Sequence, residues 1–288
     1  MKCCIIGNCQ VEPIFELLNT SESFNEKYLK TDVYKIFEIP DPEELFKSLN
    51  DYDTIIIQPV SESYIDGKFS VKRMLDNFPR EKLIFIVNSY FNGYHPEMIY
   101  LYDINGGHIN HYNVDYHDKN IFIGHYENKE LKNYPEDPDF YTKEQSWNLV
   151  EINIKNLKER ENNMFGTNVP VDIKISDYIE SNFQKKRLFN TFNHPATPLL
   201  FEVTNRILNY LKLPNDIIHP KKELLNDVIF PIYKSTQKNL ELEFSEPITY
   251  KMKKRKYSYE EILSLYVNYY TNVLKSYTVN NNYKWLNK

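Results

Sequence analysis

KCCIIGNC, at residues 2–9, decides the fold: it is a short apolar run with β-branched residues that ends abruptly in Gly7, Asn8 and Cys9. Three further apolar runs follow it, VYKIFEI at 33–39, DTIIIQPV at 53–60 and KLIFIVNS at 82–89. Helical patterns separate the runs, at 12–19, 42–49 and 71–78. Strands that are apolar at consecutive positions and alternate with helices are typical of a parallel sheet covered on both faces. The sequence therefore predicts an α/β fold, a three-layer parallel sheet.

Polar residues follow these runs at the points where strands are expected to end. Gly7 to Gln10 lie at the end of the first run, Gln58 and Pro59 at the end of the third, and Asn88 and Ser89 at the end of the fourth. In open α/β sheets, ligands bind outside the carboxyl ends of the strands. We therefore expect the functional site to lie among these polar residues.

Beyond residue 90 the pattern is less regular. A loop-rich stretch at 90–140 precedes a helix whose start is marked by a capping box between Thr142 and Gln145. A second helix is predicted with Thr197 as its N-cap, and a third over 258–277. We divide the chain into an α/β domain with helical insertions at 1–215 and a C-terminal extension or lid at 216–288.

Composition excludes several classes of protein. The 288 residues include seven glycines, and neither a dinucleotide-binding fingerprint nor a P-loop can be drawn through their positions. The net charge of −5 gives no basic field for nucleic acid. No apolar stretch is long enough to span a bilayer, and the N-terminus does not resemble a signal peptide. We therefore expect a cytoplasmic protein with no transmembrane segment and no nucleic-acid partner.

Two local features of the sequence differ from its overall composition. The basic run KMKKRK at 251–256 is most simply a solvated loop, and peripheral association with an anionic surface is the alternative. All three cysteines, Cys3, Cys4 and Cys9, fall within the first nine residues, a spacing that fits neither a disulfide framework nor a zinc site. We expect no metal.

Cys9 is the candidate nucleophile. It is expected where the first strand passes into a helix that begins near Val11, so its thiol would face unpaired N–H groups and the positive end of the helix dipole, which favour a thiolate. Asn8 and Gln10 place amide donors on either side, as an oxyanion site requires. The alternative is that Cys9 is a small buried apolar residue.

A cysteine nucleophile needs a base, and three histidines precede proline, which can fix their orientation. His95 follows the fourth apolar run, His194 precedes the second predicted helix, and His219 has no comparable position. Both His95 and His194 can be brought to the carboxyl edge of the sheet. Candidates for a residue that orients the base are Asn190, Asp115 and Asp118, and the sequence does not choose among them.

Five segments together resemble a known family. They are IIGNCQ at 5–10, IIIQPV at 55–60, FNGYHPEMIY at 91–100, YHDKN at 116–120 and FNTFNHP at 189–195. This combination is similar to the WcbI family of polysaccharide-biosynthesis acetyltransferases, which occurs in bacterial capsule clusters. The resemblance runs from residue 1 to about 215.

The resemblance implies a fold like that of the SGNH hydrolases, related to the flavodoxin-like sheets, with transfer of an acyl group from coenzyme A to a sugar hydroxyl. Cys9 would take the place of the SGNH serine, His194 that of the base and Asn88 that of the oxyanion asparagine. The SGNH pattern has an aspartate three residues before the histidine, whereas this chain has Thr191. The third member of a triad is therefore missing or comes from elsewhere.

The resemblance also implies a binding site for CoA or acetyl-CoA, in which the expected contacts are Gly7, Asn8, Gln10, Gln58 and His95. The phosphates of CoA call for cations or helix N-termini, because no glycine-rich loop is present. The candidates are Lys185, Lys186 and Arg187, with Lys72 and Arg73 as a second pair. The alternative for each set is that its cations are exposed to solvent and bind no phosphate.

Three functions follow as hypotheses. The first is a CoA-dependent acyltransferase, an O-acetyltransferase in capsular or surface polysaccharide biosynthesis, whose partners are acyl-CoA and a saccharide acceptor. The second is a cysteine-dependent esterase or thioesterase with the same Cys9 and His194. The third is a glycan-assembly protein without turnover, which Thr191 in place of aspartate would favour.

Overall fold

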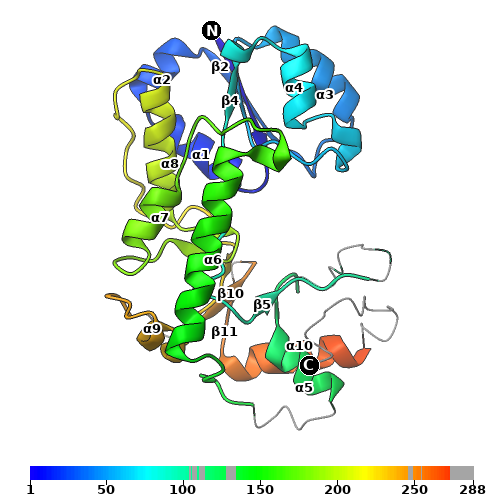
Figure 1. Cartoon of the computed structure of the whole chain (residues 1–288), viewed down its shortest axis with the longest axis vertical. Coiled ribbons are helices and arrows are strands. Elements are labelled where there is room, and N and C mark those ends of the chain that lie inside the picture. The colour runs from blue at the N-terminus through cyan, green and yellow to red at the C-terminus, as the bar shows by residue number, and fades with distance from the viewer. Residues whose placement is uncertain are drawn as a thin grey trace. The chain divides into compact units, whose positions relative to one another are not determined.

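The computed structural model describes residues 1–103, 105, 109, 114–127, 134–245, 249–253 and 255–272 (Figure 1). Its chain divides into two compact units. Unit 1 comprises 1–91, 151–189 and 193–225, and unit 2 comprises 92–150, 190–192 and 226–288. The division into an α/β domain at 1–215 and a C-terminal extension or lid at 216–288 stays a prediction.

Unit 1 is built on the four-stranded parallel sheet that the sequence predicts. Its strands are parallel and have the order β2-β1-β3-β4. Strand β1 therefore lies inside the sheet, with β2 added on one side of it and β3 and β4 on the other. Their bounds are β1 Lys2–Gly7, β2 Lys30–Lys35, β3 Thr54–Ile57 and β4 Leu83–Phe85. This is the doubly wound order in which ligands bind at the switch point between β1 and β3.

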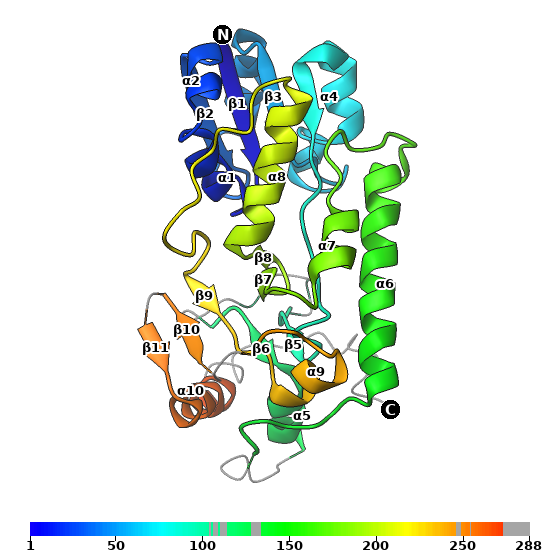
Figure 2. The ribbon, with the colours of Figure 1, turned by 90° about the vertical axis from the view of Figure 1, so that its left-hand side faces the viewer.

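Helices cover both faces of this sheet, which explains why β1, β3 and β4 are buried at consecutive positions, whereas the edge strand β2 is only partly buried. Side chains from alternate positions, such as Cys4, Ile6 and Ile57, are buried in one cluster with residues of α3 (Pro42–Ser48) and α4 (Val71–Asn77). Helices α1 (Val11–Leu18) and α8 (Thr197–Tyr210) lie on the other face, as Figure 2 shows. The three-layer prediction is confirmed.

Shorter elements complete unit 1. These are helices α2 (Glu22–Lys27) and α7 (Ser176–Asn182), the 3₁₀ turns η1 (Leu49–Asp51), η2 (Ile65–Gly67), η3 (Arg80–Lys82) and η5 (Met164–Gly166), and strand β8 (His194–Pro195). Helix α6 (Lys143–Asn162) begins in unit 2 and ends in unit 1, and strand β7 (Phe189–Thr191) also crosses the division.

The two predicted helix starts have different outcomes. The capping box is confirmed, because the Thr142 N–H donates to Gln145 Oε1 at 2.9 Å and the Gln145 N–H donates to Thr142 Oγ1 at 3.2 Å. Thr197 as an N-cap is wrong: Ala196 occupies that position and Thr197 is the first helical residue. The Thr197 hydroxyl instead accepts from the Leu224 N–H at 3.0 Å, so it is not available to cap the helix.

Unit 2 has a core rich in tyrosine. It contains β5 (Met98–Ile99), β6 (His117–Asp118), α5 (Lys119–Tyr126), β9 (Val228–Ile229), α9 (Lys234–Asn239), β10 (Tyr250–Met252), β11 (Arg255–Tyr257) and α10 (Tyr259–Asn272). Tyr266, one of its buried tyrosines, donates its hydroxyl to the Tyr116 carbonyl at 2.9 Å. The predicted helix over 258–277 is confirmed as α10, and its part beyond residue 272 lies outside the described residues.

The basic run 251–256 lies on the antiparallel pair β10 and β11, with Lys254 outside the described residues. Its association with an anionic surface stays a prediction. In the part of the chain that the structure describes, no helix is both long and apolar enough to cross a bilayer.

The end of β1 depends on a glycine for reasons of space. A Cβ added to Gly7 would lie 2.5 Å from Gln58 Oε1 and 2.6 Å from Val11 Cγ1, both far inside van der Waals contact. We expect Gly7→Ala to lower the free energy of unfolding by about 3 kcal/mol, because neighbouring side chains must leave their packed positions.

Urea unfolding followed by circular dichroism measures this change. Gly166→Ala is the control, since nothing lies within 4 Å of its Cβ and only its φ of 76° opposes the substitution. Gly166→Ala should lower the free energy of unfolding by about 1 kcal/mol. Equal unfolding midpoints for wild type and Gly7→Ala would contradict the packing argument.

Candidate functional site

The turn between β1 and α1 is held by its own polar groups. The Gln10 N–H donates to Asn8 Oδ1 at 2.9 Å, and the Val11 N–H donates to the Asn8 carbonyl at 3.2 Å. The Asn8 N–H in turn donates to Gln58 Oε1, also at 2.9 Å, at the end of β3. The polar ends of β1 and β3 are therefore joined, as expected at a switch point.

Gln10 connects this turn to two distant segments of unit 1. Its side chain is 2 % exposed. The two hydrogens of its Nε2 are shared among three acceptors, Asn88 Oδ1 and the carbonyls of Ser89 and Asn193, each at 2.9 Å. Its Oε1 accepts from Gln58 Nε2 at 3.0 Å and from the Ser89 N–H at 3.1 Å. A single buried amide thus ties together the ends of β1, β3 and β4 and the residue before His194.

Backbone groups fix the orientation of every amide in this network. The Ser89 N–H can only donate, and the Ser89 and Asn193 carbonyls can only accept, so the oxygen and nitrogen of Gln10 cannot be exchanged. Asn88 must therefore present its oxygen to Gln10 Nε2. In the same way, the Gln10 N–H requires the oxygen of Asn8.

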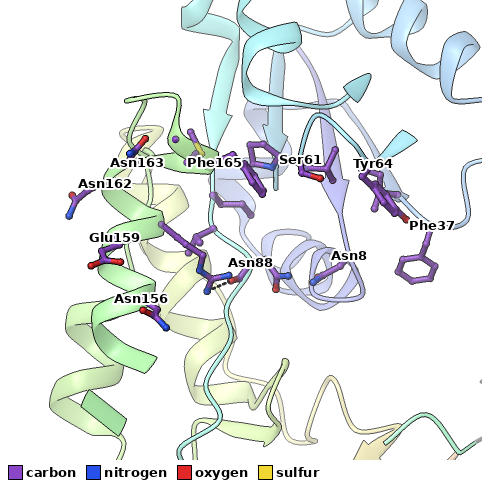
Figure 3. Close-up of a pocket in the computed structure, with 18 residues that line it drawn as sticks. Asn8, Phe37, Ser61, Tyr64, Asn88, Asn156, Glu159, Asn162, Asn163 and Phe165 are labelled. Atoms are coloured by element: carbon purple, nitrogen blue, oxygen red, sulfur yellow. Dashed lines mark hydrogen bonds between the residues drawn. The ribbon is translucent and has the colours of Figure 1, made fainter. Parts of the chain in front are cut away.

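The consequence is a pair of oriented amide donors. With both oxygens engaged, the Nδ2 groups of Asn8 and Asn88 have no acceptor among the residues that the structure describes. Both asparagines line a pocket (Figure 3). Arg160 Nη2 donates to the Asn88 carbonyl at 3.2 Å, which also holds the backbone of Asn88. Donors that are fixed before a ligand arrives are what an oxyanion site needs.

Cys9 lies in the same turn and is partly buried. The expected thiolate is not favoured: burial raises the pKa of the Cys9 thiol to about 11, and the backbone hydrogen bond and the charge of Lys35 lower it only in part. The sequence argument was wrong on this point because it counted the helix N-terminus and left out desolvation. Cys9 is therefore a neutral thiol near pH 7.

His194 is half-buried at the start of β8. The hydrogen bond from Gln10 to the Asn193 carbonyl connects the chain immediately after Cys9 to the chain immediately before His194. The two motifs that suggested a nucleophile and a base therefore share one buried contact. The role of His194 as a base stays a prediction.

The pocket lies at the carboxyl edge of the sheet in unit 1 and has a volume of about 1110 Å³. Its walls come from the chain that follows β1 to β4 and from the end of α6 with the turn after it (Figure 3). The lining residues are Asn8, Ile36, Phe37, Pro59, Val60, Ser61, Tyr64, Ile86, Val87, Asn88, Asn156, Glu159, Arg160, Asn162, Asn163, Met164, Phe165 and Gly166. The position matches the sequence prediction, and two of the predicted site residues, Asn8 and Asn88, line the pocket.

Sequence reasoning missed the wall formed by α6 and its following turn. Arg160 belongs to the charged run at 158–161 near the end of α6, which matches no binding motif. The available signal was the pair Phe165–Gly166 directly after that helix, in a chain with few glycines. Phe165 has a φ of 50° and Gly166 a φ of 76°. Such backbone is uncommon for a bulky residue and occurs where surrounding structure holds it in place.

The other predicted contacts occupy varied environments. Gly7, Gln10 and Gln58 are buried within the amide network. His95 belongs to unit 2, is fully buried, and has Nε2 3.2 Å from the Phe230 carbonyl oxygen. Their contacts with a cofactor stay predictions.

The predicted phosphate-binding residues do not line the pocket. Lys185 is exposed, Lys186 Nζ donates to the Tyr178 hydroxyl at 3.2 Å, and Arg187 Nε donates to the Phe189 carbonyl at 3.0 Å. Lys72 is exposed, and the Arg73 guanidinium lies 4.8 Å from the centre of the Phe46 ring.

Of the residues considered for orienting the base, Asp118 has a clear structural role. It caps α5 through the Asn120 and Ile121 N–H groups, and it accepts from the Tyr233 hydroxyl at 2.9 Å. Asn190 and Asp115 also belong to unit 2. Among the described residues, no three His, Cys, Asp or Glu side chains are grouped in a way that could hold a metal ion.

The raised pKa of Cys9 predicts its reactivity. Alkylation of Cys9 by iodoacetamide should be slow at pH 7 and accelerate about tenfold per pH unit towards pH 10, because the thiolate is the reacting species. Mass spectrometry of the intact protein measures the rate. Cys9→Ser is the control, since Cys3 and Cys4 are completely buried and should stay unlabelled. A rate that reaches its plateau by pH 8 would contradict the pKa of about 11.

Comparisons with known proteins agree with this fold. No curated protein matches the sequence. A solved structure, described as WcbI, a novel polysaccharide biosynthesis enzyme, matches with a TM-score of 0.81 and 22 % identity, over 94 % of this chain and 89 % of that one. Its description specifies the native protein without a disulfide bond between CoA and a cysteine. This likeness confirms the fold.

The family is established by sequence. The model of the family described as polysaccharide biosynthesis enzyme WcbI matches residues 2–216. That range includes the whole amide network, both asparagine donors and His194, and it agrees with the extent of the resemblance found in the motifs. The chain belongs to the WcbI family of polysaccharide biosynthesis enzymes.

Proposed function

We propose that this chain is a CoA-dependent acyltransferase that moves an acyl group, in the simplest case acetyl, from acyl-CoA to a saccharide hydroxyl in the synthesis of a capsular or surface polysaccharide. The observation that carries the proposal is the pair of oriented donors, Asn8 Nδ2 and Asn88 Nδ2, at the carboxyl edge of the sheet. The solved relative supports it, because its description refers to CoA and a cysteine.

The donors suit the chemistry of acyl transfer. When a hydroxyl oxygen attacks the thioester carbonyl carbon, negative charge moves onto the carbonyl oxygen. Two amide N–H groups whose orientation is already fixed, those of Asn8 and Asn88, would stabilise that charge without reorganising. His194 takes the proton of the hydroxyl, and the CoA thiolate leaves when the tetrahedral intermediate collapses.

Cys9 can enter this reaction in two ways. In one, His194 deprotonates Cys9, and an acyl-Cys9 intermediate passes the acyl group to the sugar. In the other, the sugar hydroxyl attacks acyl-CoA directly and Cys9 remains a neutral thiol beside the thioester. The raised pKa of Cys9 favours the direct route, because it costs free energy to form the thiolate.

The phosphates of CoA need cations. Lys185, Lys186 and Arg187 remain our candidates, because Lys185 is exposed and the three residues precede the strand that leads to His194. Lys72 and Arg73 are the second candidates, of which Arg73 is already engaged with the Phe46 ring.

Release of free CoA tests the proposed function against the alternatives. Acetyl-CoA is mixed with the protein, with and without candidate glycans. Release that requires an acceptor supports the acyltransferase. Release without an acceptor supports an esterase or thioesterase, and no release with any acceptor supports a glycan-assembly protein without turnover.

Asn88→Asp is expected to lower kcat by about 10²–10³, because the carboxylate keeps the acceptor for Gln10 and replaces the donor by a negative charge. Calorimetric CoA affinity should change much less. Asn77→Asp, an exposed position on α4 with the same charge change, is the control and should keep wild-type kcat. A kcat within threefold of wild type in Asn88→Asp would refute the oxyanion role.

His194→Ala is expected to lower the rate more than His95→Ala, since the base is assigned to His194. If the reaction passes through an acyl-Cys9 intermediate, Cys9→Ala should abolish turnover. If the sugar hydroxyl attacks acyl-CoA directly, Cys9→Ala should keep part of the turnover. Intact-mass measurement after addition of acetyl-CoA shows whether an adduct of one acetyl group forms on wild type and is absent in Cys9→Ala. Wild-type activity in His194→Ala would remove this residue from the mechanism.

A further inference from the structure

Three large aromatic side chains are exposed around the pocket of unit 1. They are Phe37, 56 % exposed, Tyr64, 42 % exposed, and Phe165, 57 % exposed. We call these residues the aromatic rim, and all three are labelled in Figure 3. Single exposed apolar residues need no explanation, whereas several that line one pocket mark a binding surface.

Phe165 is held in its exposed position by the turn around it. Met164 is buried and anchors the turn, while its N–H donates to the Val169 carbonyl at 3.0 Å. The Thr167 N–H donates to the Met164 carbonyl, also at 3.0 Å. Phe165 itself has a φ of 50°, so the turn keeps an aromatic residue in a conformation that glycine would adopt more readily. Strain that is held in this way points to a function for the side chain.

Tyr64 is presented in a similar way. The Tyr64 N–H donates to the Ser61 carbonyl at 3.1 Å, and the Gly67 N–H donates to the Tyr64 carbonyl at 3.0 Å. The two residues after Tyr64, Ile65 and Asp66, have φ values of 49° and 51°. Two unrelated turns therefore each place an aromatic ring at the pocket by means of left-handed backbone.

The charge of the pocket decides between classes of ligand. Of the lining residues, Glu159 and Arg160 carry opposite formal charges that cancel, and Arg160 already donates to the Asn88 carbonyl. The other polar side chains are mostly amides, among them Asn156 on α6. A phosphate-rich ligand needs an excess of cations, which these residues do not supply. Neutral hydroxyl groups, by contrast, are well matched by amides.

We propose that this pocket is the acceptor subsite and that it binds a neutral pyranose whose C–H face packs on the aromatic rim. The C–H bonds of a pyranose face are weakly positive and complement the negative face of an aromatic ring. The proposal rests on the proposed function in one respect, that the sugar hydroxyl must reach Asn8 and Asn88, which line the same pocket. It also places the CoA phosphates outside this pocket.

Saturation-transfer-difference NMR tests the proposal without turnover. The probes are methyl α-D-glucopyranoside and methyl α-D-mannopyranoside, with methyl β-D-glucuronide as a charged comparison. Wild type should bind at least one neutral pyranoside, and Phe165→Ala and Tyr64→Ala should each weaken that binding at least fivefold. Phe140→Ala, an exposed aromatic position outside the pocket, should bind like wild type.

Calorimetric titration with CoA completes the test. The two rim variants should keep the CoA affinity of wild type within twofold, and circular dichroism should show them folded, since both side chains are exposed. The proposal is overturned if no neutral pyranoside binds, if the rim variants bind it as well as wild type does, or if they lose CoA affinity instead. The last outcome would make the pocket the nucleotide site.

Failure of this proposal is distinguishable from failure of the proposed function. A protein that binds the pyranoside at the aromatic rim and releases no CoA with any acceptor refutes the acyltransferase and leaves the subsite standing. A protein that transfers the acyl group while both rim variants keep the KM for the acceptor refutes the subsite and leaves the acyltransferase standing.

Discussion

The buried amide of Gln10 is the interaction on which the site depends. It contacts three backbone groups and two side-chain amides, and the backbone groups determine which atom of each amide donates. A buried amide that lost these partners would cost about 1–3 kcal/mol for each unsatisfied group. The same contacts turn Asn8 and Asn88 into fixed donors. The stability of this turn and the orientation of the two donors therefore depend on one set of hydrogen bonds, and the space for that set exists because Gly7 has no side chain.

Much of unit 1 could be predicted from local pattern. The four apolar runs became the four strands, although β2 spans Lys30–Lys35, so it begins and ends earlier than the run at 33–39. Both faces of the sheet are buried, and consecutive apolar positions carry that information directly. The polar residues at the strand ends pointed to the edge where the pocket lies, because parallel strands bring their carboxyl ends to one edge. The Thr197 cap failed because a partner distant in sequence, the Leu224 N–H, takes its hydroxyl.

What could not be predicted depends on contacts between distant segments. The contact at Asn193 is made by its backbone carbonyl and Arg160 belongs to no motif, so only the fold shows that they meet Gln10 and Asn88. The pKa of Cys9 follows from burial, which a helix-dipole argument does not include. The aromatic rim consists of single residues after three different elements, so no periodic pattern marks it.

The hydrogen bond between Gln10 and Asn193 joins residues 183 positions apart. The contact requires the chain before α8 to return to the end of β1. Contacts of such long sequence separation are costly to close early in folding. We therefore expect the contact between Gln10 and Asn193 to form late, so that a folding intermediate with an intact sheet would still lack the connection between the turn after β1 and the chain before His194.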